Sequence, residues 1–100
     1  MKILAIERDV PGANDDAYTA ELLHAEARRA WQLYQEGIAR ELYFRADRTE
    51  AVIMLECASV EAARTALETL PLVQAGLVAF DLIPLKAYPG FERLFAANAR

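Results

Sequence analysis

Hydrophobic and polar positions along the chain follow two periods, one typical of helices and one typical of strands. The longest helical pattern covers residues 16–36, where apolar residues recur every three or four positions, and Gly37 is its expected stop. A second helical pattern begins after Ser59, a good N-cap, and ends at Pro71. Strand-like apolar runs cover residues 3–8, 38–45, 51–57 and 77–85. The predicted order is strand, helix, strand, strand, helix, strand.

This order is that of the split βαβ, or ferredoxin-like, α+β fold, in which two helices cover one face of a four-stranded antiparallel sheet. A length of 100 residues predicts a single domain over residues 1–100. Pro84 has no N–H to donate, which predicts that the last strand lies at a sheet edge or ends there.

Hydrophobic residues make up 55% of the chain, more than one small protomer comfortably covers. The uncovered face of the predicted sheet keeps apolar residues, so we expect a second copy to pack against it, sheet to sheet, as in a dimeric α+β barrel. The aromatic tail, residues 88–100, is expected to pack on that partner subunit.

Composition excludes several classes of function. The net charge is −4, and no basic patch with interleaved aromatic residues is present, which argues against nucleic acid as a partner. The single cysteine, Cys57, allows no disulfide within the chain and favours a reduced compartment. The first apolar run breaks at residues 7–9, too early for a signal peptide, and no run is long enough to span a membrane. We therefore expect a cytoplasmic protein.

Glu26 is the most informative residue of the long helical pattern. On a helical wheel it falls inside the apolar arc and is the arc's only charged member. A carboxylate on a core-facing stripe is costly unless it is paired, protonated or directed into a cavity. Glu26 also lies toward one edge of the arc, where a long side chain can reach water, so both a structural and a chemical role remain open.

Glu26 is also the first of a set of residues whose order and spacing are informative together. The set consists of Glu26, Leu33, Glu36-Gly37, Arg40, Leu42, Leu70-Pro71-Leu72, Pro84-Leu85 and Pro89. In this set the chain resembles the muconolactone isomerases, within the dimeric α+β barrel proteins, over roughly residues 19–91. The chain departs from the family pattern at Ala25, Ala39, Glu41 and Tyr88, which leaves the substrate open.

The resemblance implies an isomerase that shifts a double bond in a small lactone carboxylate by proton abstraction and return. It implies no metal and no organic cofactor, and higher oligomers built from dimers. Proton abstraction beside a carbonyl needs a base whose pKa is raised toward neutrality, and burial on an apolar helix face would do this for Glu26. Arg40 is the candidate anchor for an anionic substrate, because a regular strand would place it on one face with Leu42 and Phe44. The alternative for Arg40 is an ion pair, for which Glu26 is a candidate partner.

Four further residues are candidates of the same site. His24, the single histidine, is a second catalytic candidate as a proton shuttle, although an exposed helix position is the simpler interpretation. One histidine without a neighbouring cysteine gives little support to a metal site. Tyr34, Tyr43 and Tyr88 are candidates for lining a substrate pocket, with packing in the core as the alternative.

Three functions are consistent with this sequence. The first is a cofactor-free isomerase that acts on a small lactone or organic acid, with Glu26 as base. The second is a non-catalytic ligand-binding or structural oligomer, in which Glu26 and Arg40 form a buried pair. The third, a cofactor-independent monooxygenase, rests on fold analogy alone.

Overall fold

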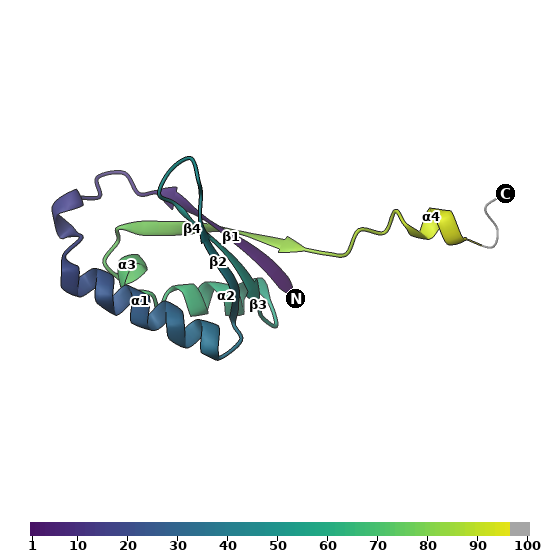
Figure 1. Cartoon of the computed structure of the whole chain (residues 1–100), viewed down its shortest axis with the longest axis horizontal. Coiled ribbons are helices and arrows are strands. Elements are labelled where there is room, and N and C mark those ends of the chain that lie inside the picture. The colour runs from purple at the N-terminus through teal and green to yellow at the C-terminus, as the bar shows by residue number, and fades with distance from the viewer. Residues whose placement is uncertain (97–100) are drawn as a thin grey trace.

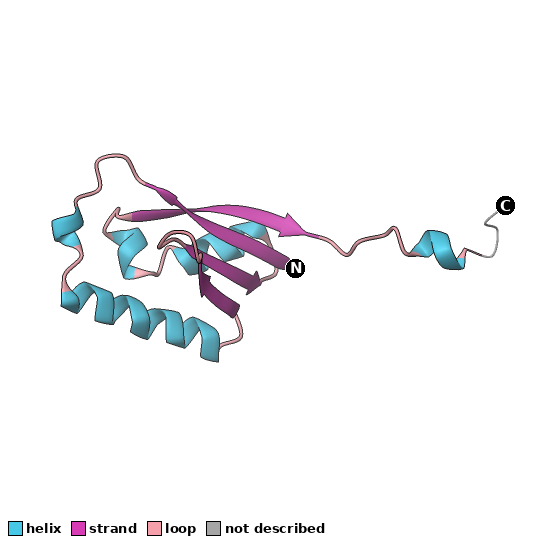
Figure 2. Ribbon diagram, turned by 45° about the horizontal axis from the view of Figure 1, so that its top comes forward, coloured by secondary structure: helices cyan, strands magenta, loops and turns pink. Residues whose placement is uncertain are grey.

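The computed structural model describes residues 1–96 and has the predicted ferredoxin-like βαββαβ arrangement (Figures 1 and 2). Its main elements are β1 (Lys2–Asp9), α1 (Ala20–Gln35), β2 (Ala39–Phe44), β3 (Ala51–Glu56), α2 (Val60–Leu67) and β4 (Val78–Leu85). Three short elements accompany them: the 3₁₀ turn η1 (Asp15–Ala17), α3 (Pro71–Gln74) and α4 (Glu92–Phe95). Among residues 1–96, no helix is both long and apolar enough to cross a membrane.

The four strands form one antiparallel sheet in the order β2-β3-β1-β4. Ile3 on β1 lies opposite Leu55 of β3 on one side and Pro84 of β4 on the other. Because β4 is an outer strand, Pro84 disturbs no inner ladder, and the prediction of an edge strand is confirmed.

The long helix is shorter at its start than its apolar pattern predicts. Thr19 has an extended backbone and its hydroxyl accepts a hydrogen bond from the Leu22 N–H, so it is the N-cap and α1 begins at Ala20. The preceding Asp15–Ala17 segment forms a separate 3₁₀ turn. The predicted stop is confirmed, because Gly37 adopts a φ of +78°, a conformation that glycine takes without strain.

The second helical region is divided in two. Ser59 caps α2 as predicted, with its hydroxyl accepting from the Ala62 N–H. The prediction that this helix runs to Pro71 is wrong, because α2 ends at Leu67 and Pro71 begins α3. Proline suits the first position of a helix, since its fixed φ fits and its missing N–H would have no helical partner there.

The hydrophobic core lies between the helices and one face of the sheet. Ile3, Ala5 and Leu55 on the two central strands are fully buried, and Leu33 of α1 packs into the same cluster. These positions alternate along β1, so the residues at odd numbers face the helices. The same phase continues to Glu7 near the end of the strand.

A β-bulge interrupts β2. Ala39 lies opposite Leu55 and Glu41 lies opposite Met54, which leaves Arg40 as an extra residue without a partner on β3. The extra residue shifts the alternation by one, so that buried Ala39 and the following Leu42 both face the helices. The predicted face shared by Arg40 and Leu42 is therefore not formed.

The C-terminal segment leaves the body of the molecule after β4 and projects away from it (Figure 1). It accounts for the long dimension of 63 Å, against 28 and 23 Å for the other two axes. Its apolar side chains are exposed, with Phe91, Leu94 and Phe95 at 65%, 74% and 82%. Residues 97–100 of the predicted 88–100 tail lie outside the described part, and packing on a partner subunit stays a prediction.

Candidate functional site

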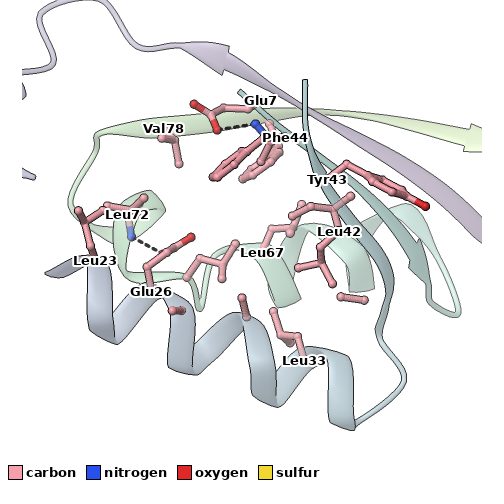
Figure 3. Close-up of a pocket in the computed structure, with 17 residues that line it drawn as sticks. Glu7, Leu23, Glu26, Leu33, Leu42, Tyr43, Phe44, Leu67, Leu72 and Val78 are labelled. Atoms are coloured by element: carbon pink, nitrogen blue, oxygen red, sulfur yellow. Dashed lines mark hydrogen bonds between the residues drawn. The ribbon is translucent and has the colours of Figure 1, made fainter. Parts of the chain in front are cut away.

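A cavity of about 350 Å³ lies between α1, α3 and the helix-facing side of the sheet (Figure 3). Two carboxylic acids, Glu7 and Glu26, are the charged residues of its lining within residues 1–96. The rest of the lining is apolar apart from the rim residue Tyr43, and it includes Leu33, Leu67, Leu72, Val78 and Phe80. Exposed side chains at the mouth, Leu23 on α1 and Phe44 on β2, show that the cavity is open to the surface.

Glu26 projects from α1 into this cavity and is tied to α3. Its Oε1 accepts a hydrogen bond of 2.9 Å from the Leu72 N–H. Leu70, the N-cap of α3, provides no side-chain cap, and Pro71 has no N–H. Glu26 therefore satisfies the first free N–H of α3 from another helix, a structural role that its own sequence context does not reveal.

The second carboxyl of the cavity, Glu7, is a site residue that the sequence analysis missed. Glu7 shares the helix-facing phase of Ile3 and Ala5, and its Oε1 accepts a 2.9 Å hydrogen bond from the Ala51 N–H. Because the first apolar run ends at Glu7, the sequence suggested that this residue is at the polar end of the strand. The period of two along β1 was the signal that could have placed it in the core layer.

The cavity raises the pKa of both carboxyls. For Glu26, burial raises the pKa, the Leu72 hydrogen bond lowers it, and the charge of Glu7 raises it further. For Glu7, burial raises the pKa, the Ala51 hydrogen bond opposes this, and the charges of Glu50 and Asp9 add to the increase. The expectation of a raised Glu26 pKa thus agrees with its surroundings, because desolvation outweighs a single backbone hydrogen bond.

Tyr18 is a polar neighbour of both acids. Its hydroxyl donates to the Leu77 carbonyl oxygen at 3.3 Å. Burial raises its pKa first, and the negative charges of Glu7 and Glu26 contribute to the same increase. Tyr18 therefore stays protonated as a hydrogen-bond donor over the working range of a carboxyl pair.

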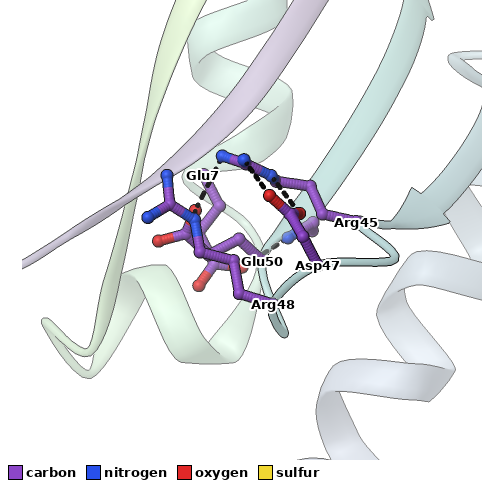
Figure 4. Close-up of polar contacts among 6 residues, drawn as sticks. Glu7, Arg45, Asp47, Arg48 and Glu50 are labelled. Atoms are coloured by element: carbon purple, nitrogen blue, oxygen red, sulfur yellow. Dashed lines mark hydrogen bonds and ion pairs between the residues drawn. The ribbon is translucent and has the colours of Figure 1, made fainter.

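The turn between β2 and β3 fixes the partner of Glu7. Glu50, buried to 9% exposure, forms ion pairs with Arg48 Nε at 2.9 Å and with Arg45 Nη1 at 3.5 Å (Figure 4). Arg45 also pairs with Asp47 at 2.6 Å. These ion pairs hold the turn that presents the Ala51 N–H to Glu7. They also commit Arg45 to the turn.

Arg40 lies outside the cavity. It is exposed at the β2 bulge, and its Nε donates to the Gly37 carbonyl oxygen at the end of α1. Within residues 1–96, neither Arg40 nor any other cation is paired with Glu26. The partner of Glu26 is a backbone N–H instead, because the bulge removes Arg40 from the face that Leu42 occupies.

Of the other candidates, Tyr43 alone borders the cavity, and its hydroxyl donates outward to Glu41 at 2.7 Å. His24 is exposed on α1, and Tyr34 stacks on Trp31 at the surface with 5.6 Å between ring centroids. Tyr88 is in the projecting tail, edge-on to Phe91. The structure thus joins Glu26 and Tyr43 at one cavity and places His24, Tyr34 and Tyr88 elsewhere on the protomer.

Metal ligands are not gathered at this site. Within the described residues, no group of three or more His, Cys, Asp or Glu side chains is arranged to hold a metal ion. Cys57 is free and half-buried at the end of β3, away from the cavity lining.

Comparison with known proteins shows which solved structures this chain is similar to. No family model matches the chain, and no curated protein does. The solved structure of a muconolactone isomerase matches with a TM-score of 0.72 and 26% identity, over 89% of this chain and 92% of that chain. The structure of 5-chloro-2-hydroxyhydroquinone dehydrochlorinase from Burkholderia phenoliruptrix AC1100, in complex with 2,5-dihydroxybenzoquinone, shares the fold. It matches with a TM-score of 0.64 and 18% identity, over 90% of this chain and 98% of that one. Together with the fold, the likeness to the muconolactone isomerase structure bears out the resemblance of this chain to that family.

Proposed function

We propose that this protein is a cofactor-free isomerase that moves a double bond in a small lactone or related carbonyl compound, with Glu26 as the base. The observation that carries the proposal is the Glu26 carboxyl, held at an apolar cavity that raises its pKa. A base that removes a proton beside a carbonyl works best when its pKa lies near the working pH. The hydrogen bond from Leu72 fixes one carboxyl oxygen and leaves the other for a substrate.

The cavity suits a ligand of modest size. Its volume of about 350 Å³ lies at the lower end of the range for small-molecule sites, and its wall is almost entirely apolar. Such a wall excludes water from the reacting carbon and strengthens the polar contacts of the few polar groups present. Arg40, His24, Tyr34 and Tyr88 are given no substrate contact within one protomer, because they lie outside the lining.

A second candidate function follows from the same hydrogen bond. If Glu26 serves only to cap α3, the protein is a non-catalytic ligand-binding oligomer with an apolar cavity. This alternative is favoured by the 2.9 Å bond to Leu72, which gives Glu26 a structural reason to be present.

Turnover of muconolactone by the Glu26→Gln variant separates the two functions. Glutamine keeps an oxygen for the Leu72 N–H but cannot accept a proton, so the isomerase proposal predicts a loss of about 10²–10⁴-fold in kcat. Glu21→Gln is the matched control, since Glu21 is exposed in the first turn of the same helix. Equal turnover by the Glu26→Gln variant and the wild type would remove Glu26 from the chemistry. Binding of the lactone without any turnover by the wild type would favour the second function.

We also propose that the protein is a homo-oligomer in which a second copy covers exposed apolar surface. The outer face of the sheet carries the half-buried residues Leu4, Ile6, Val52 and Met54, and the tail exposes three large apolar side chains. Apolar surfaces of this kind are typical of interfaces between subunits.

A further inference from the structure

Glu7 is the buried acid that the proposed base does not explain. It lies on the sheet wall of the cavity, on β1, while Glu26 lies on the helix wall, on α1 (Figure 3). The two carboxyls come from residues 19 positions apart in the sequence and face the same apolar space.

Both carboxyls are oriented in the same way. Each binds one backbone N–H through a single oxygen, at 2.9 Å to Ala51 for Glu7 and at 2.9 Å to Leu72 for Glu26. Within residues 1–96, no buried side-chain oxygen or nitrogen lacks a hydrogen-bond partner. The second oxygen of each acid is therefore not sealed in the core but is accessible from the cavity.

The surroundings of Glu7 favour its protonated form. Burial, Glu50 on the β2–β3 turn and Asp9 on its own strand all raise its pKa, against the lowering by the Ala51 hydrogen bond. The nearby guanidinium groups of Arg45 and Arg48 are directed at Glu50 and Asp47. Two acids in one low-dielectric cavity favour the state with a single shared charge, one acid protonated and one ionised.

We propose that Glu7 is the second acid–base group of this cavity and returns a proton to the substrate after Glu26 has removed one. This inference rests on the proposed isomerase function and adds a residue and a proton route to it.

Protons and bonds balance in the proposed double-bond shift. Glu26 takes the proton from the carbon at one end of the allylic system, and the electrons of that C–H bond form a new double bond as the conjugated carbonyl becomes an enolate. The enolate then collapses, and the carbon at the other end of the allylic system forms a C–H bond with the proton of Glu7. One C–H bond breaks, one forms and the double bond moves. Glu26 ends protonated and Glu7 ionised, and exchange with solvent restores the starting state.

This route has an isotopic signature. With two groups, the proton that arrives on the product comes from Glu7, which has exchanged with solvent. With Glu26 alone, the substrate proton can be carried directly to its new carbon. In D₂O, we therefore expect the isomer formed from muconolactone to contain one deuterium from the first turnover onward. Retention of the substrate hydrogen would overturn the proposal.

The Glu7→Gln variant tests the residue itself. Glutamine keeps the oxygen that accepts from the Ala51 N–H, so the strand contact persists, and we expect kcat to fall about 10²–10⁴-fold. Asp81→Asn is the matched control, because it removes one carboxylate charge from the neighbouring strand β4 at an exposed residue outside the lining, and it should retain turnover. Full turnover by the Glu7→Gln variant, together with loss in the Glu26→Gln variant, would overturn this inference and leave the proposed function in place.

A measurement that needs no turnover completes the test. A ¹³C NMR titration of Glu7 should give a lower pKa in the Glu26→Gln variant than in the wild type, because the interaction between the two carboxyls is mutual and the charge of the ionised base is gone. If glutamine at position 7 disturbs the strand, Glu7→Asp, which keeps the carboxyl but shortens the reach, replaces it in the kinetic assay. An unchanged Glu7 pKa would show that the two acids do not act as a pair. A wild type that leaves muconolactone unchanged would count against the proposed function, and the NMR result would still decide the pairing.

Discussion

Three substitutions at Glu26 separate its structural role from its proposed chemistry. The Leu72 N–H is the first donor of α3 and has Glu26 as its side-chain partner. Glu26→Ala removes that partner and leaves a partly buried N–H unsatisfied, which costs about 1–3 kcal/mol of folding free energy. Glu26→Gln keeps an acceptor oxygen and also removes the burial cost of a carboxylate. Glu26→Asp keeps the charge but shortens the side chain by one methylene.

The glutamine variant is expected to be nearly as stable as the wild type. A hydrogen bond to a charged group exceeds a neutral one by about 1 kcal/mol, and relief from burying the charge offsets part of that difference. We therefore expect the free energy of unfolding of Glu26→Gln to lie within about 1 kcal/mol of the wild type. For a domain of this size, each kcal/mol corresponds to about 4–8 °C in Tm, so Glu26→Ala should be lower by several degrees and Glu26→Gln should differ little.

Urea unfolding followed by circular dichroism, with Tm from calorimetry, measures this series. The reasoning is refuted if Glu26→Gln is as unstable as Glu26→Ala, because the charge itself would then be required, as in an ion pair. It is also refuted if Glu26→Ala matches the wild type, because the α3 contact would then contribute nothing. Glu21→Ala on the exposed side of α1 controls for the change in helix propensity.

Two further predictions concern pH and assembly. Because the pKa values of Glu7 and Glu26 are raised in the folded state, their contribution to stability is fully present below the usual carboxyl value of 4.5 and is lost as the pH rises through their folded values. Between pH 4 and pH 7, the unfolding free energy of the wild type should therefore fall relative to that of the Glu7→Gln/Glu26→Gln double variant. Parallel pH curves for the two proteins would contradict this. In the tail, Phe91→Ser with Phe95→Ser should lower the sedimentation coefficient by weakening the assembly, while Glu92→Ser with Arg93→Ser should not. Equal coefficients for the two pairs of substitutions would remove the tail from the interface.

The element order and the position of Glu26 could be predicted because both depend on local periodicity. The alternation of strands and helices, the cap at Ser59 and the glycine stop at Gly37 are each visible within a few residues of sequence. Glu26 stood out because one charged residue within an apolar helical arc is a strong local contrast.

The missed features depend on contacts between distant residues. The cap of α3 by Glu26 joins positions 46 residues apart, and the bond of Glu7 to Ala51 joins positions 44 apart. Pro71 was interpreted as a stop, although proline is equally suited to the first position of a helix. The alternation of apolar and polar residues along β2 could not reveal the bulge at Arg40, because a bulge exists only relative to the pairing with the neighbouring strand β3.

The bulge in β2 has a consequence for comparing this chain with related sequences. Arg40 is the residue of β2 that has no partner on β3, so losing it would leave Ala39, Glu41 and the residues after them on their present faces. Loss of a residue of β2 that is paired with β3 would instead turn the side chains between that position and the bulge to the opposite face of the sheet. Alignments of related chains should therefore place length differences in this strand at position 40, where an insertion or deletion keeps the cavity wall intact.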